Sequence, residues 1–170
     1  APASGRLAIA EAITNILAAD VADLADIRLS ANWMAACGEP GEDASLYATV
    51  EAVGEQLCPA LGIAIPVGKD SLSMRTAWSE QGETRSVIAP VSLIVSAFAP
   101  VADVRRTLTP ALADDAGETA LVLVDLGAAE PRLGGSILAQ VHGALGDVPP
   151  DLDDPALLRG FARALRELRA

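Results

Sequence analysis

The chain has 170 residues, of which 51% are hydrophobic and only 3% aromatic, and its formal net charge at pH 7 is −11. This length allows one domain or two small ones, with a core built mainly from Ala, Leu, Val and Ile. The acidic charge argues against nucleic acid or an anionic membrane as a partner. A ligand that carries phosphate would need a metal ion or a local basic group.

The two cysteines, Cys37 and Cys58, show no metal-binding or redox spacing. We therefore expect a reduced, cytoplasmic setting in which neither thiol is reactive. The longest apolar run, 87–99, contains Pro90 and is too short to cross a bilayer. The N-terminus lacks a basic stretch followed by an apolar one, so we expect no signal peptide there. Because the sequence lacks an initial Met and opens close to a helix, we expect a piece of a longer polypeptide.

Apolar residues at three- and four-residue spacing predict a helix over 6–19 and another over 44–61. Asp43 is the expected N-cap of the second helix, and Pro59 is expected to end it early or to kink it. Short apolar runs and turn residues predict the other elements up to residue 98: an acidic connection 20–26, a strand 27–30, a long loop 32–42, a strand 62–67, a hairpin of 72–78 and 85–89, and a buried strand 91–98.

After Pro110 the composition becomes more polar before the apolar pattern returns. The last helix is expected to start at Asp154 and Pro155, an N-cap followed by proline at the first helical position. Its arginines at 163, 166 and 169 are expected to form a solvated face favoured by the helix dipole. The remaining predicted elements are a short helical connection 101–108, a polar stretch 111–118, a strong strand 119–125, a loop 126–135, a helix 136–145 and a linker 149–154.

Glu11 and Asn15 lie four residues apart in the first predicted helix. At 3.6 residues per turn they point roughly the same way, about 6 Å apart along the axis. A carboxylate and an amide carbonyl are hard oxygen donors that suit Mg²⁺. The same spacing also occurs on solvated helix faces and in buried hydrogen bonds, so the pair alone leaves the metal site open.

Lys69, Asp70 and Ser71 follow a predicted strand and Gly68. A glycine, an ammonium group and a hydroxyl can approach a phosphate or carboxylate, but the spacing is not that of a P-loop. A polar turn is the alternative. Likewise, residues 134–136 (Gly-Gly-Ser) could hold an anion at a helix start or could form a close-packed loop. His142 has no acidic or thiol neighbour in sequence, so we expect a surface or packing role.

Several longer stretches, taken in order, resemble the large, single-chain form of the phosphoribosylformylglycinamidine synthase family, the FGAR amidotransferases of purine biosynthesis. The stretches are 6–15 (RLAIAEAITN), 29–35 (LSANWMA), 38–44 (GEPGEDA), 67–74 (VGKDSLSM), 92–98, 103–110, 133–136 (LGGS) and the helix around Gln140. The SANWM and VGKDS blocks argue against related ATP enzymes such as selenophosphate synthetase or thiamine-phosphate kinase.

The resemblance implies an α+β fold and a place in a larger ligase. Such enzymes convert formylglycinamide ribonucleotide to its amidine with ATP and with ammonia released from glutamine. Their synthetase region contains two copies of the fold shared with aminoimidazole ribonucleotide synthetase. Residues 1–100 would be the late part of the N-terminal subdomain in the second copy, and residues 101–170 the start of its C-terminal subdomain.

In this family the second copy keeps an auxiliary, structural nucleotide site, where a Glu-x-x-x-Asn helix helps to hold magnesium. The resemblance therefore implies that Glu11 and Asn15 are Mg²⁺ ligands beneath ATP or ADP. It implies no catalytic residue here, because the glutaminase domain would lie downstream and another acidic metal-binding loop upstream. The partners implied are the other domains of the parent chain. A non-catalytic scaffold without nucleotide is the alternative interpretation.

Overall fold

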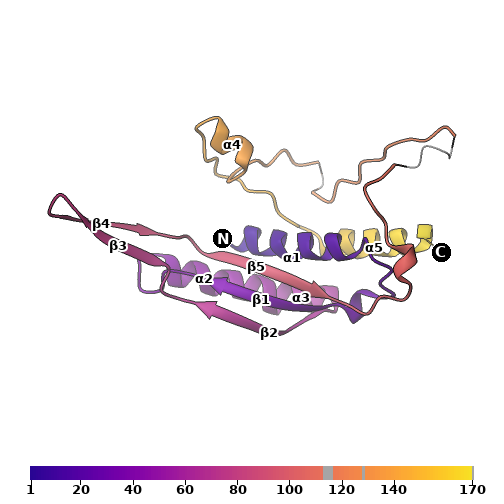
Figure 1. Cartoon of the computed structure of the whole chain (residues 1–170), viewed down its shortest axis with the longest axis horizontal. Helices are drawn as coiled ribbons and strands as arrows, with labels where there is room; N and C mark the ends of the chain where they lie inside the picture. The colour runs from indigo at the N-terminus through magenta and orange to yellow at the C-terminus, as the bar shows by residue number, and fades with distance from the viewer. Residues whose placement is uncertain (113–116, 128, 170) are drawn as a thin grey trace.

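The computed structural model describes residues 1–112, 117–127 and 129–169. It contains a three-stranded sheet, helices that cover one face of the sheet, a separate hairpin and a long C-terminal stretch (Figure 1). The α-helices are α1 (Pro2–Ile16), α2 (Glu42–Val50), α3 (Cys58–Leu61), α4 (Ile137–Val141) and α5 (Pro155–Arg169). The strands are β1 (Arg28–Met34), β2 (Ala64–Ser71), β3 (Arg75–Glu80), β4 (Glu83–Ile88) and β5 (Ser92–Phe98). This mixture of helices and a mixed sheet confirms the predicted α+β class.

The sheet has the order β2-β1-β5, with β1 parallel to β2 and antiparallel to β5. Paired residues point to the same face, so the register divides the side chains of β1 and β5 into two sets. Leu29 lies beside Ala97 on the face that packs into the core. Asn32 lies beside Ile94 on the opposite face, where Ile94 is exposed. One face of the sheet is therefore covered by helices and the other is open.

The core joins α1 to the helices that follow β1 and to the covered face of the sheet. Figure 1 shows α1 running along β5, with α2 and α3 behind the strands. The aliphatic side chains expected from the low aromatic content fill this space, and α5 adds Leu158 to them. The fully buried members are Ile9, Ile13, Ile27, Leu29, Val53, Leu57 and Leu158.

The helix predicted over 44–61 is interrupted in the structure. It consists of α2, a π-helical segment η2 (Glu51–Leu57) and α3, which has Pro59 in its first turn. Proline has no backbone N–H to donate to the preceding turn, so the helix widens before it rather than ending. Asp43 lies inside the first turn, and Gly41 is the N-cap, so the predicted cap is wrong by two residues.

Two stretches predicted as loops are instead strand. β1 continues to Met34, into the predicted loop 32–42, and β2 continues through 68–71, where a polar turn was the alternative to a phosphate-binding segment. Their polar residues pair with one another, as Asn32 does with Lys69. The hairpin is confirmed with β3 and β4 shifted by a few residues, and it turns through Gln81 and Gly82, both at positive φ.

The predicted strand 119–125 is absent from the described part of the structure. Residues 119–125 form irregular chain, and Leu121, Val122 and Leu123 are more than 80% exposed. A strand needs a hydrogen-bonded neighbour, and no described segment pairs with this one. The helix predicted over 136–145 is reduced to α4, whereas the last helix is confirmed as α5. The short helical turns η1 (Leu24–Asp26) and η3 (Val104–Arg106) occur in the two predicted connections.

Candidate functional site

Helix α1 carries the two predicted metal ligands. Its buried stripe, which includes Ile9 and Ile13, faces the core, and Glu11 and Asn15 lie on the exposed side one turn apart. Neither side chain takes part in a hydrogen bond or ion pair with another described residue. Their oxygen atoms are therefore available to a ligand from outside this part of the chain.

A cleft lies between α1 and the described residues of 125–127 and 129–152, and we call it the α1 cleft. One part, of about 480 Å³, is lined by Leu7, Glu11 and Thr14 of α1 and by residues 125–127, 130, 132 and 150–152. The other part, of about 650 Å³, is lined by the first turns of α1, Glu11, residues 134–136, residues 145–147 and residues 149–150. Glu11 and Leu7 line both parts, whereas Asn15 lines neither. The structure thus places one of the two predicted ligands in the cleft wall.

Two arginines form ion pairs with the linker 149–154, which is part of the cleft wall that faces α1. Arg6 of α1 donates from Nε to Asp151 Oδ1 at 2.8 Å, and its Nη2 lies 2.5 Å from Oδ2. Arg132 makes a second two-pronged contact with Asp153, at 3.0 and 2.6 Å. Hydrogen bonding to Asp151 raises the pKa of Arg6, and the hydrogen bond from Arg132 holds the pKa of Asp153 below its ordinary value. The linker is therefore attached to α1 and to the 125–135 loop by charged hydrogen bonds.

Arg132 also lines the cleft, although it was not predicted from the sequence as a site residue. Its Nη2 donates to the carbonyl oxygen of Asp151 at 3.2 Å, and its Nε is buried without a hydrogen-bond partner among the described residues. Since this Nε atom is enclosed and the two terminal nitrogens contact Asp153, Arg132 holds the loop to the linker rather than facing the cleft as a free cation. The only signal in the sequence is one Arg inside a glycine-containing loop, which is too common to identify a site.

The chemistry of the donor set fits a hard divalent cation only in part. Glu11 and Asn15 offer a carboxylate and an amide oxygen, and Mg²⁺ accepts one or two protein oxygens together with phosphate and water. Across residues 1–112, 117–127 and 129–169, no three His, Cys, Asp or Glu side chains are close enough to hold a metal ion. A complete metal site would therefore draw its other ligands from a nucleotide, from water or from other protein segments.

Lys69, Asp70 and Ser71 lie on β2 and not in a turn. Lys69 Nζ donates to Ser71 Oγ at 2.7 Å. By register Lys69 lies on the open face of the sheet with Asn32, whereas α1 packs on the other face. The structure therefore does not bring Lys69 together with Glu11. The oxygen Oδ1 of Asn32 is buried without a hydrogen-bond partner in the described part of the chain.

The Gly-Gly-Ser sequence lies in the wall of the α1 cleft, but its backbone donors are occupied. The amides of Gly134, Gly135 and Ser136 donate to the carbonyl oxygens of Val148, Leu145 and Leu133, at 2.8, 2.7 and 3.1 Å. The hydroxyl of Ser136 caps α4 by accepting from the amide of Ala139. This is the close-packed loop that was the alternative to an anion site. His142 follows α4 on the surface, as expected.

Neither cysteine has the surroundings of a reactive thiol. Burial raises the pKa of Cys58 to about 11. Cys37 is exposed, and its pKa is raised by desolvation and then by its hydrogen bond with Asp43. Both shifts disfavour the thiolate, which is the nucleophilic form.

No helix of the described residues combines the length and the apolar character needed to span a bilayer. Residues 1–100 match the family model described as the FGAR-AT PurM_N-like domain. This match covers α1, the sheet and the hairpin, and so includes Glu11, Asn15 and Lys69. The corresponding parent enzymes are ligases of purine biosynthesis, in which this domain is one of several. Since the match spans more than half of its length, the chain belongs to the FGAR amidotransferase family and carries its PurM_N-like domain.

Proposed function

We propose that this chain forms part of an auxiliary Mg²⁺–nucleotide site in a phosphoribosylformylglycinamidine synthase. The parent enzyme would convert formylglycinamide ribonucleotide to the amidine in the cytoplasm, with ATP and with ammonia from its glutaminase domain. Glu11 and Asn15 would hold Mg²⁺, and the metal would neutralise the phosphate oxygens of ATP or ADP. No residue of this chain takes a catalytic role in the proposal.

The observation that carries the proposal is the position of Glu11. Its carboxylate lies in the wall of a cleft large enough for a nucleotide and forms no ion pair with another described residue. A glutamate that only keeps a surface soluble can lie anywhere on that surface, whereas ligand sites are concave. The position of Glu11 in a cleft wall therefore favours a binding role. Because the chain has a net charge of −11, a phosphate group there requires compensating positive charge.

Arg132 lines the same part of the α1 cleft as Glu11, but its guanidinium group is already paired with Asp153. The positive charge for a phosphate in the cleft would therefore come mainly from a metal ion held from α1. We also keep Lys69, Asp70 and Ser71 as a proposed phosphate-binding group, separate from the α1 cleft.

The test is Mg–ADP binding to the full-length enzyme and to its Glu11→Ala variant, measured by calorimetry. Glu55→Ala is the matched control, because Glu55 is an exposed helical glutamate that does not line the α1 cleft. We expect the Glu11 variant to lose at least about tenfold in affinity, because even a group that only orients a metal ligand contributes that much. The control should bind normally. Equal binding by all three proteins would disprove the proposal.

A non-catalytic scaffold without nucleotide is the second candidate function. The observation that favours it is Asn15, which lines neither part of the α1 cleft. In that case Glu11→Ala would leave turnover, nucleotide content and melting temperature unchanged. An auxiliary structural site would instead lose bound nucleotide and heat stability while turnover persists. A collapse of turnover with normal stability would indicate a catalytic site.

A further inference from the structure

A second cleft lies between the turn that follows α1 and helix α5, and we call it the arginine cleft. Its floor is apolar, because Leu17, Val21 and Leu61 are nearly fully buried beneath it. Its rim carries three guanidinium groups from α5, those of Arg159, Arg163 and Arg166. They repeat at positions i, i+4 and i+7, which places them on one side of the helix. An apolar pocket is therefore bordered by a row of positive charges.

This concentration of positive charge is unusual for the molecule. The chain has eleven arginines and a net charge of −11, yet the helix from 155 to 169 contains four arginines and a single acidic residue, Glu167. The helix dipole explains a preference for cations only in its last turn. Arg159 and Arg163 lie outside that turn, so the dipole does not account for them.

Few carboxylates neutralise the rim. Asp23 is the one acidic residue lining the arginine cleft, and it lies 3.8 Å from Arg166, which also donates to the carbonyl oxygen of Ala22 at 2.9 Å. Arg163 lies 3.8 Å from Glu167 in an exposed pair, which is a weak and replaceable contact. Arg159 forms no ion pair within the described part of the chain. The rim therefore keeps an excess of positive charge over its apolar floor.

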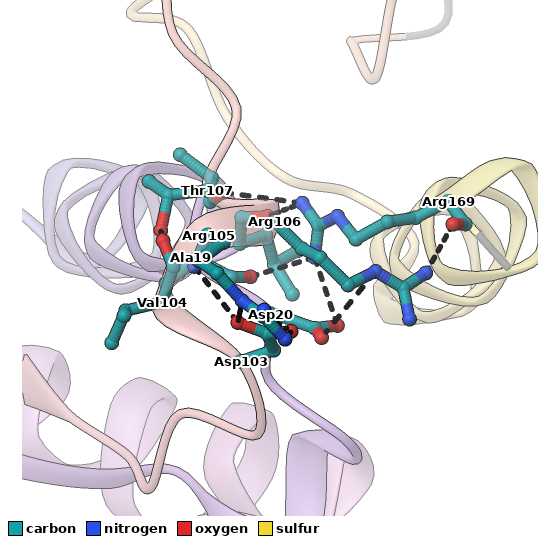
Figure 2. A network of polar contacts seen from close by, with 10 residues as sticks. Ala19, Asp20, Asp103, Val104, Arg105, Arg106, Thr107 and Arg169 are labelled. Carbon is teal, nitrogen blue, oxygen red and sulfur yellow. Dashed lines mark hydrogen bonds and ion pairs between the residues drawn. The ribbon is translucent and has the colours of Figure 1, made fainter.

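The walls of the cleft are held in place by a fourth arginine. Arg169 donates to the carbonyl oxygens of Leu17, Ala18 and Ala19 in the turn that follows α1, at 2.7 to 3.2 Å. Figure 2 shows Arg169 and Arg106 converging on Asp20 beside the 3-10 turn that starts after Asp103. These contacts join α5 to the turn that forms the opposite wall. A pocket that is already formed loses less entropy when it binds a ligand.

The size of the cleft decides between classes of ligand. Its volume is about 220 Å³, below the range of roughly 300–1,000 Å³ typical of pockets for drug-sized molecules. This space suits one or two apolar side chains. The arginines on the rim would then meet carboxylates on either side of the inserted side chain, since guanidinium groups bind carboxylates in a two-pronged manner.

We propose that the arginine cleft is a docking site for an acidic peptide segment of a protein partner, in which Glu or Asp residues flank an apolar anchor. The anchor fills the space above Val21 and Leu61, and the flanking carboxylates pair with Arg159 and Arg163. The acidic charge elsewhere on the chain opposes this binding only weakly, because charges beyond about 8 Å are screened at physiological salt. The proposal does not depend on the Mg²⁺–nucleotide site.

The test uses fluorescence anisotropy of labelled twelve-residue peptides with the full-length protein. The probe alternates Glu with Leu and Phe, and its counterpart replaces every Glu by Gln. We expect the acidic probe to bind at least about tenfold more tightly than the Gln peptide, and its affinity to fall as salt is raised. Equal binding of the two peptides would overturn the proposal.

Three variants locate the binding on the surface. The double variant Arg159→Gln and Arg163→Gln removes charge from two exposed positions, and Ala22→Trp fills the cleft from its exposed edge without changing any charge. Each should weaken the acidic probe at least about tenfold, whereas Arg85→Gln on strand β4 should not. Normal binding by the double variant or by Ala22→Trp would overturn the proposal, as would an equal loss with Arg85→Gln. Circular dichroism and melting curves show that each variant is folded.

Discussion

Arg169 Nη1 lies 3.8 Å from the Oδ1 atom of Asp20, so α5 at one end of the sequence is joined to the turn after α1 at the other. The Arg169 side chain is 6% exposed, and it also donates to three carbonyl oxygens of that turn. The last carbonyl groups of a helix have no partner within the helix. Here the carbonyl groups are those of Leu17, Ala18 and Ala19, just after α1, and an arginine from a distant element donates to them. Figure 2 shows Arg169 beside Ala19 and Asp20.

Replacing Arg169 by Ala should lower the free energy of unfolding by about 3 kcal/mol, because buried charged hydrogen bonds are lost and Asp20 loses one of its partners. The measurement is urea denaturation followed by circular dichroism. Arg163→Ala is the control on the same helix, and because its ion pair is exposed it should cost less than about 0.5 kcal/mol. Equal losses of stability in the two variants would show that the buried hydrogen bonds of Arg169 add no more stability than an exposed ion pair.

Asp153 predicts a pH-dependent contribution to stability. The hydrogen bond from Arg132 holds the pKa of its carboxyl below the ordinary value. Stabilisation by such a group is complete well above the unfolded pKa of about 3.9 and is lost as the pH falls through the lower, folded pKa. Asp153→Asn should therefore be less stable than the wild type at pH 7. In urea titrations the difference between the two proteins should shrink as the pH falls below the unfolded pKa of about 3.9. A difference that stays constant on acidification would contradict the charge-based explanation.

Two glycines should respond in opposite ways to replacement by Ala. A Cβ atom on Gly68 would lie 2.2 Å from the backbone oxygen of Ala31 in the neighbouring strand, so Gly68→Ala should destabilise the protein by about 2 kcal/mol. A Cβ on Gly160 meets nothing within 4 Å, and this helix position should gain about 0.5 to 1 kcal/mol. The measurement is the melting temperature of each variant compared with the wild type. A higher melting temperature for Gly68→Ala would exclude the close approach of β2 to Ala31.

The two thiols should differ in labelling by a disulfide reagent at pH 8. Cys58 is buried and its pKa is raised to about 11, so its thiolate is scarce and inaccessible in the native state. We expect native protein to label at Cys37 alone, and more slowly than a free cysteine because its pKa is also raised. Labelling of both thiols at equal rates in native protein would contradict the burial of Cys58. Protein unfolded in guanidinium chloride should label at both thiols, and this sample is the reference for complete labelling.

The sequence by itself determined the elements whose local pattern agrees with their packing. The stripe that contains Ile9 and Ile13 predicts the core face of α1, and Asp154 with Pro155 marks the start of α5. The spacing of Glu11 and Asn15 placed both residues on one side of α1, which the structure bears out. Their role as metal ligands remains a prediction. These features depend on residues within one or two turns, which is the range over which a sequence pattern is readable.

Tertiary structure decided the features that need a distant partner. Polar residues 68–71 belong to β2 because they form strand hydrogen bonds with β1. The strongly apolar stretch 119–125 is not a strand, because no described segment pairs with it. In the same way, the predicted solvated face of α5 is wrong for Arg169, which instead binds carbonyl oxygens of the turn after α1. Backbone hydrogen bonds between strands and charged caps between helices join residues far apart in sequence, and local propensity does not encode which partner is near.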